Sequence, residues 1–198
     1  HGQDLESKRG QDRRQIGQFT LEYIVEDPEG WTPAEGTTVY GKITCAAGPV
    51  ANVVVSDGVD FAVTDEQGRY ELQSKKALGY VFMSVPSGYD PIANGVMPVN
   101  YKLLSGSATT AERVDFSLNK VDQTNYRVLF FGDMHLANRT DDVKQFGDLV
   151  KDVNANGIKG KTYAITLGDM TWDLYWYDNN FQFSNYIDLM NRSFKNLI

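Results

Sequence analysis

Two different hydrophobic patterns divide the chain near position 120. Between Thr37 and about Asn119, short runs alternate apolar and polar residues, and turn residues interrupt them at intervals of roughly 8 to 12 residues. After Asp122, the apolar residues form continuous runs or recur at helical spacing. The sequence therefore predicts a mixed fold: an all-β sandwich module at 36–120, followed by an incomplete α/β domain at 121–198.

The predicted β module consists of short strands separated by glycine-containing turns. The expected strands are Val39–Cys45, Val53–Val55, Phe61–Thr64, Arg69–Leu72, Gly79–Val85 and Arg113–Leu118. In the last strand, Val114, Phe116 and Leu118 would share one face. The intervening segment 86–111 is rich in proline, glycine and serine, and is predicted to be a long loop.

Residues 1–35 are predicted to be an arm or linker, partly disordered. Basic and acidic residues are interleaved at first, and the segment turns acidic from Glu22 to Glu35. A short alternating stretch, Phe19–Val25, is compatible with an edge strand that docks on the folded part.

The second half is predicted to run strand, helix, strand, helix. Tyr126–Phe131 is expected to be a strand buried on both faces, and Tyr163–Leu167 the next strand, parallel to it. The first helix would begin at Thr140 or Asp141 and end near Asn156. Its apolar face is formed by Val143, Phe146, Val150 and Val153. The last helix begins at about Ser184, with a stripe of Tyr186, Ile187, Met190, Phe194 and Leu197.

Candidate chemistry lies just beyond the ends of the two α/β strands. Gly132-Asp133-Met134-His135 follows the first strand and Gly168-Asp169-Met170 the second. Because parallel strands deliver their carboxyl ends to one edge of a sheet, Asp133, His135 and Asp169 should converge there, with each glycine allowing a tight turn. Carboxylate and imidazole groups are ligands that Zn, Mn and Fe accept. The pattern predicts a metal site.

Simpler interpretations of these residues stay open. A loop aspartate such as Asp169 often caps a helix or turn, and His135 would then be an ordinary surface residue. An aromatic cluster follows Asp169, and it would line a substrate rim or, as we favour, contribute to packing. Its members are Trp172, Tyr175, Trp176 and Tyr177.

The β module resembles transthyretin-like or carboxypeptidase-regulatory-like modules. The resemblance rests on Val39-Tyr40-Gly41-Lys42-Ile43, Gly48-Pro49-Val50, Val53-Val54-Val55-Ser56-Asp57-Gly58 and the turn-containing run from Thr64 to Leu72. It implies a spacer or docking platform without chemistry of its own. It also implies an extracytoplasmic location: periplasmic, secreted or at the cell surface.

The two glycine-aspartate motifs are similar to the first two motifs of the calcineurin-like metallophosphoesterases. The resemblance implies that Asp133 and His135 bind the first metal and that Asp169 bridges both. The ions would be divalent Mn, Zn or Fe, and a metal-bound hydroxide would hydrolyse a phosphate ester. Residues of that family that act as catalytic or substrate-binding groups are not identified in this sequence.

The sequence also departs from that family. The family continues with a Gly-Asn-His-Asp or Gly-Asn-His-Glu motif and further histidines, whereas His1 and His135 are the only histidines here. The second metal site is therefore incomplete, and we expect this chain to be the front of a longer protein, inactive or nearly so by itself. The missing carboxyl-terminal part, or a homo-oligomeric neighbour, is expected to cover the incomplete domain.

Composition narrows the possible partners. A formal charge of −7 argues against nucleic-acid binding. Apolar runs of at most four residues are too short for a membrane span. The single cysteine, Cys45, lies in a strand-like run and is predicted to be a buried, inert thiol. The competing function is a non-catalytic surface or adhesion protein whose β-sandwich binds a glycan or a protein.

Overall fold

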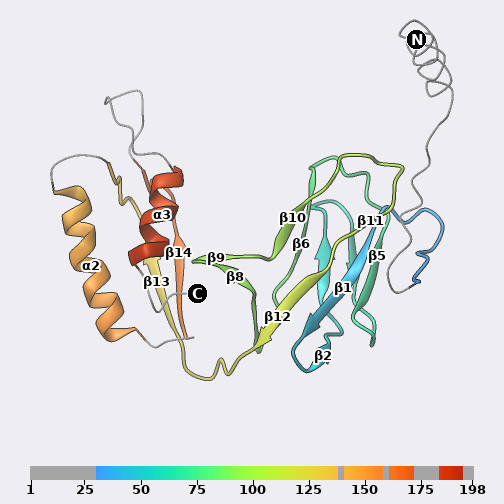
Figure 1. Cartoon of the computed structure of the whole chain (residues 1–198), viewed down its shortest axis with the longest axis horizontal. Coiled ribbons are helices and arrows are strands. Elements are labelled where there is room, and N and C mark those ends of the chain that lie inside the picture. The colour runs from blue at the N-terminus through green and yellow to red at the C-terminus, as the bar shows by residue number, and fades with distance from the viewer. Residues whose placement is uncertain (1–29, 138–140, 158–160, 172–182, 194–198) are drawn as a thin grey trace, which may run out of the picture. The chain divides into compact units, whose positions relative to one another are not determined.

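The computed structural model describes residues 30–137, 141–157, 161–171 and 183–193 (Figure 1). The chain divides into two compact units, His1–Thr32 and Pro33–Ile198, and the fold below is that of the second. The predicted edge strand Phe19–Val25 lies outside the described residues.

One sheet of the β module is built around strand β1 (Val39–Cys45). Its neighbours are antiparallel β5 (Arg69–Leu72) and β2 (Gly48–Pro49), and parallel β11 (Glu112–Arg113) and β12 (Phe116–Lys120). β12 also pairs with antiparallel β7 (Tyr89–Pro91). β1 and β5 have the predicted bounds, because both strands combine clean alternation with clear turn residues at their ends.

The second sheet has four strands in the order β10, β6, β3 and β4, each antiparallel to its neighbour. Their bounds are Val54–Ser56 for β3, Phe61–Val63 for β4, Tyr80–Met83 for β6 and Tyr101–Leu103 for β10. The two sheets enclose one hydrophobic core, which makes the module sandwich-like as predicted. The core includes Val39, Ile43, Tyr70, Leu72, Phe116 and Leu118 from the first sheet, and Val55, Val81 and Met83 from the second.

The segment 86–111 is not the loop that its composition predicts. It contains β7, β10 and a two-stranded hairpin, β8 (Ala93–Asn94) with β9 (Met97–Pro98). These strands are only two or three residues long, and β7 and β10 pair with partners distant in sequence. Because no local alternation develops in such short strands, proline and glycine dominate the sequence pattern.

The predicted strand Arg113–Leu118 is divided into β11 and β12. Asp115 interrupts the predicted strand, because its side-chain Oδ1 accepts a hydrogen bond from the backbone amide of Lys42 at 2.8 Å. Val114, Phe116 and Leu118 are all buried nevertheless, which confirms the predicted shared face. Cys45 is only partly buried and packs against the edge of the core.

The second half contains β13 (Arg127–Phe131), α2 (Asp142–Asn156), β14 (Thr162–Thr166) and α3 (Phe183–Ser193). β13 and β14 are parallel, as the sequence predicts, with Arg127 opposite Thr162 and Phe131 opposite Thr166. Both helices contribute to one core cluster with Phe131.

Most of the predicted helix faces agree with the structure. In α2, Phe146, Val150 and Val153 are buried, whereas Val143 is 38% exposed and does not join the core. Val143 lies in the first turn of the helix, beyond the end of the face that packs on the sheet. In α3, Tyr186 and Met190 are buried and Ile187 is half-buried. Phe194 and Leu197 lie outside the described residues.

The expectation that β13 is buried on both faces is wrong. Phe130 is 63% exposed and its neighbour across the ladder, Ile165, is 46% exposed. The helices cover only the opposite face, where Phe131 and Leu129 pack. In the part of the chain that the structure describes, the sheet of β13 and β14 has two strands and one helical layer, so much of its second face, including Phe130, stays open.

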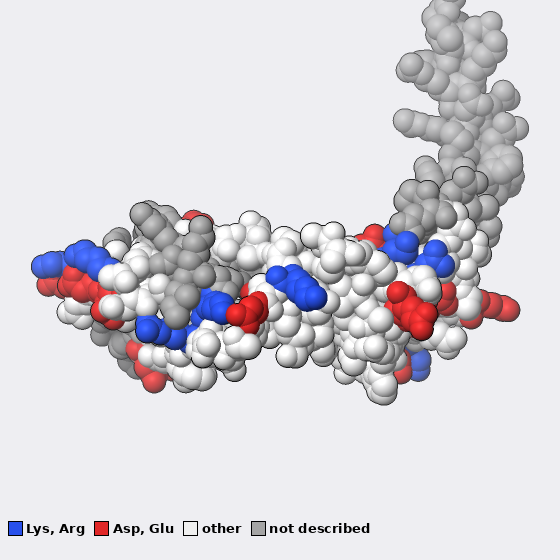
Figure 2. Space-filling model, turned by 90° about the horizontal axis from the view of Figure 1, so that it is seen from below, with Lys and Arg blue, Asp and Glu red and all other residues white. Residues whose placement is uncertain are grey.

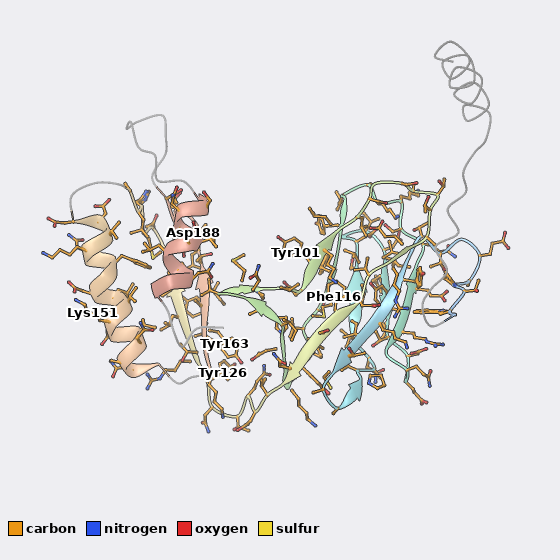
Figure 3. The ribbon with its side chains drawn as sticks, viewed as in Figure 1. Tyr101, Phe116, Tyr126, Lys151, Tyr163 and Asp188 are labelled. Carbon is orange, nitrogen blue, oxygen red and sulfur yellow. The ribbon has the colours of Figure 1, made fainter. Side chains whose placement is uncertain are left out.

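A buried carboxylate connects β14 to the β module. The Tyr163 hydroxyl donates to the two carboxylate oxygens of Asp90, at 3.0 and 3.1 Å, and the Gln123 amide donates to Oδ1 at 3.3 Å. Asp90 is only 4% exposed. The ring of Tyr126 packs edge-on against Tyr163, with centroids 5.9 Å apart (Figure 3). These bonds satisfy a charge that would be costly to bury alone.

The charged side chains are interspersed in sign on the face shown in Figure 2, where the drawn residues form no continuous basic patch. Among the described residues, no helix is long and apolar enough to cross a membrane.

Candidate metal centre

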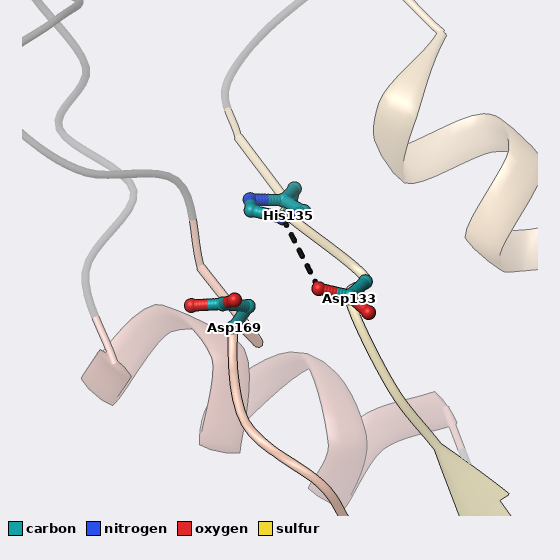
Figure 4. Close-up of side chains that lie close together, drawn as sticks. All are labelled: Asp133, His135 and Asp169. Atoms are coloured by element: carbon teal, nitrogen blue, oxygen red, sulfur yellow. Dashed lines mark ion pairs between the residues drawn. The ribbon is translucent and has the colours of Figure 1, made fainter.

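Three predicted ligands meet at the carboxyl ends of β13 and β14. Asp133 and His135 follow β13, and Asp169 follows β14. One ligand atom of each side chain lies within 4.8 Å of the corresponding atoms of the other two (Figure 4). The parallel pairing of the strands brings the two loops together, as expected from their place in the fold.

Main-chain hydrogen bonds continue beyond the strands and tie the two loops together. The Leu167 amide donates to the Phe131 carbonyl at 2.8 Å, and the His135 amide donates to the Asp169 carbonyl at 2.8 Å. The Leu136 amide then donates to the Met170 carbonyl at 3.0 Å. The backbone therefore fixes the spacing of the candidate ligands independently of their side chains.

All three candidate ligands have a left-handed backbone conformation. Their φ angles are 51° for Asp133, 43° for His135 and 47° for Asp169. This region costs a residue other than glycine about 1–2 kcal/mol, and such residues concentrate at functional sites. Gly168 has φ 105°, in line with the predicted turn. Gly132 has no positive φ, because Asp133 itself makes the corresponding turn.

The site is open to solvent. The side chain of Asp133 is 81% exposed and that of His135 is 37% exposed. The His135 Nε2 atom lies 3.6 Å from the Asp133 Oδ1 atom, the contact drawn as a dashed line in Figure 4. Asp169 is also exposed. A ligand can therefore reach all three groups without any part of the described structure moving aside.

The donor set fits a divalent ion. Zinc binds carboxylate oxygen and imidazole nitrogen at about 2.0–2.2 Å, which places neighbouring ligand atoms about 3–4 Å apart. The observed spacing of up to 4.8 Å exceeds this by an amount that small rotations of exposed side chains would close. Two carboxylates and one imidazole also suit manganese and iron.

Apolar residues between the ligands anchor both loops, a feature the sequence analysis did not single out. Met134 and Met170 pack against the core of the α/β part, and Leu136 belongs to that core. Leu136 is 4% exposed and the next residue, Ala137, is fully buried. The alternation of polar and apolar residues in Asp-Met-His-Leu would have indicated this arrangement, because the apolar residues favour burial while the polar ones stay in contact with solvent. The aromatic cluster Trp172, Tyr175, Trp176 and Tyr177 lies outside the described residues.

Comparison with known proteins relates the β module to a protein family. Residues 37–121 match the family model described as the N terminal of calcineurin-like phosphoesterase. No curated protein matches the chain. The matched region is the β module and ends before β13, so it supports this family through residues separate from the candidate ligands. The resemblance to transthyretin-like modules stays a prediction.

Proposed function

We propose that this chain is the amino-terminal part of an extracytoplasmic two-metal phosphoesterase that hydrolyses phosphate esters. The observation that carries the proposal is the convergence of Asp133, His135 and Asp169 at the ends of two parallel strands. The family match of residues 37–121 supports it independently, because that family is named for the N-terminal region of calcineurin-like phosphoesterases and suggests a phosphoesterase parent.

The three residues would divide the work of holding metal. Asp133 and His135, two positions apart on one loop, would bind the first divalent ion, Mn, Zn or Fe. Asp169 would bridge it to a second ion, whose remaining ligands we do not find among the described residues. Divalent ions bound here would activate water and offset the negative charge that develops on the phosphoryl group.

The protein's own contribution is to place these groups in advance. The bond from the His135 amide to the Asp169 carbonyl holds the loops in register. The three candidate ligands have a left-handed backbone conformation, which places their side chains at tight turns. Met134 and Met170 pack against the core and oppose movement of the loops. A site fixed before binding pays less conformational entropy when an ion or a phosphate group arrives. The exposure of Asp133 leaves room for a phosphate ester.

The open face of the two-stranded sheet needs a cover in the complete protein. Phe130, Ile165 and Leu167 are 63%, 46% and 65% exposed. Parallel sheets are normally covered on both faces. We propose that a carboxyl-terminal part of the same protein packs on this face and completes the α/β domain.

Titration with Mn²⁺ tests the metal site in this chain directly. Calorimetry should show binding by the unaltered chain, and Asp169→Asn should weaken it about tenfold or more, since an amide replaces a charged ligand. Asp188→Asn, an exposed aspartate on α3, is the matched control and should bind as the unaltered chain does. Equal affinity in Asp169→Asn and the unaltered chain would refute the metal site.

A second titration tests the link to phosphate chemistry. Inorganic phosphate should bind the Mn²⁺-loaded chain and should not bind the chain treated with a chelator. Phosphate binding that is the same with and without Mn²⁺ would contradict a phosphoesterase site at these residues, even if Mn²⁺ itself binds.

A further inference from the structure

The outer face of the four-stranded sheet of the β module is apolar and carries no charged side chain. Val55, Val81 and Met83 point into the core and are at most 1% exposed, so the residues that alternate with them point outward. We define the outer face by these outward residues of the four strands: Val54, Ser56, Phe61, Val63, Tyr80, Phe82, Tyr101 and Leu103.

Several of these side chains are strongly exposed. Phe61 is 74% exposed, Leu103 is 76% exposed, and Tyr101, labelled in Figure 3, is 52% exposed. Contiguous apolar surface of this kind is uncommon on a monomer and usually marks a site of interaction. The outer face is separate from the candidate metal centre, which lies in the α/β part.

The outer face has a ridge and a trough that follow the strands. β3 carries the smaller residues Val54 and Ser56, whereas its neighbours carry larger ones. In one row across the sheet, Ser56 lies between Phe61 on β4 and Phe82 on β6. β4 is the edge strand, so its ridge of Phe61 and Val63 stands next to the trough over β3.

The chemistry of the outer face favours a polypeptide over a glycan. A glycan needs many hydrogen-bonding groups around its hydroxyls, and besides Ser56 the outer face offers two, the hydroxyls of Tyr80 and Tyr101. The Ser56 hydroxyl already donates to the Asp60 carbonyl at 2.7 Å and accepts the Gly58 amide at 2.9 Å. The rings of Tyr80 and Phe82 are tilted by 37° and do not form a flat stacking platform.

We propose that the outer face binds a second copy of this chain in a symmetric dimer. Each copy has a formal charge of −7, so a contact between two copies is favourable only where few charged side chains meet. A two-fold contact places the same patch on both sides, and charged residues there would meet like charges. The outer face, being uncharged, avoids that conflict.

The relief of the outer face is also self-complementary. Adjacent strands lie about 4.8 Å apart. A two-fold axis parallel to the strands, running above the line between β3 and β4, would therefore set β4 of one copy over β3 of the other. Each ridge of Phe61 and Val63 would then enter the trough of the partner copy, with the sheets packed face to face as in a sandwich.

Sedimentation equilibrium of the full 198-residue chain tests the dimer. We expect a mass of twice 22.2 kDa at high concentration, with dissociation on dilution. Phe61→Asp should give a monomer at concentrations where the unaltered chain is dimeric, and Ser56→Arg, which fills the trough, should do the same. Circular dichroism would show that both variants are folded.

Phe130→Asp is the matched control, because Phe130 is an exposed phenylalanine on the open face of β13. It should leave the dimer intact. A monomeric unaltered chain at every concentration would overturn the proposal, as would dissociation by Phe130→Asp with no effect of Phe61→Asp. Binding of an oligosaccharide to the outer face of a monomer would overturn it in favour of a glycan site. None of these results depends on metal binding.

Discussion

The backbone amide of His135 donates a hydrogen bond to the carbonyl oxygen of Asp169 at 2.8 Å. The two residues belong to loops that follow different strands, and both are candidate ligands for one ion. Because the bond joins main-chain atoms, it does not depend on the side chain at either position. Substituting a candidate ligand should therefore remove a ligand without separating the loops.

The left-handed conformation of Asp169 predicts a difference between two variants that both lack the carboxylate. Asp169→Gly should be more stable than Asp169→Ala by about 0.5–1 kcal/mol, since glycine adopts φ 47° without the steric cost that alanine pays. Urea unfolding followed by circular dichroism measures the difference. An alanine variant as stable as the glycine variant would show that this turn relaxes in solution.

Replacement of Gly41 by alanine is predicted to cause a severe packing defect in the β module. A Cβ atom at this position would lie 1.9 Å from the carbonyl oxygen of Val114, in the backbone that β1 packs against. Gly41→Ala should cost about 3 kcal/mol or more, because backbone atoms and not a flexible side chain must move. Thermal unfolding would detect the loss.

Gly147 supplies the control for this prediction. It lies inside α2, and a Cβ atom there would meet nothing within 4 Å. Gly147→Ala should raise stability by up to about 1 kcal/mol, because alanine favours the helix. If both alanine variants behaved alike, the close approach at Gly41 would not be what limits that position.

The buried hydroxyl of Tyr70 leads us to expect a loss of stability at alkaline pH. Burial raises the pKa of its hydroxyl well above the ordinary value of 10.0, and the negative charge of Asp115 raises it further. The folded state thus keeps a proton that the unfolded state releases. The contribution of this protonated hydroxyl to the free energy of unfolding is fully present below pH 10 and is lost as the pH rises above that value.

Tyr70→Phe separates this effect from the hydrogen bond that the hydroxyl donates to the Val114 carbonyl at 2.6 Å. At neutral pH the variant should be less stable by about 1 kcal/mol. Between pH 10 and pH 11 its stability should fall less steeply than that of the unaltered chain, as measured by urea unfolding. Equal slopes would mean that other tyrosines account for the alkaline loss.

The local sequence pattern was sufficient to predict a strand or helix where the element has clear periodicity and clear turn residues at its ends. β1 and β5 have the predicted bounds, and α2 ends at Asn156 before Gly157 as expected. The short strands β7 to β10 were missed, because nothing in two or three residues distinguishes a strand from a proline-containing loop. Their pairing with β12 and β6, or with one another, decides their structure.

The meeting of Asp133, His135 and Asp169 was predictable from the sequence, because parallel strands end at one edge of a sheet. The alternation and turn residues likewise determined a β module followed by strands and helices. Only the tertiary structure decided that the two loops bond to one another, that the turns fall on the ligands themselves, and that one face of β13 stays open. Each of these depends on contacts between residues far apart along the chain, which periodicity and composition do not record.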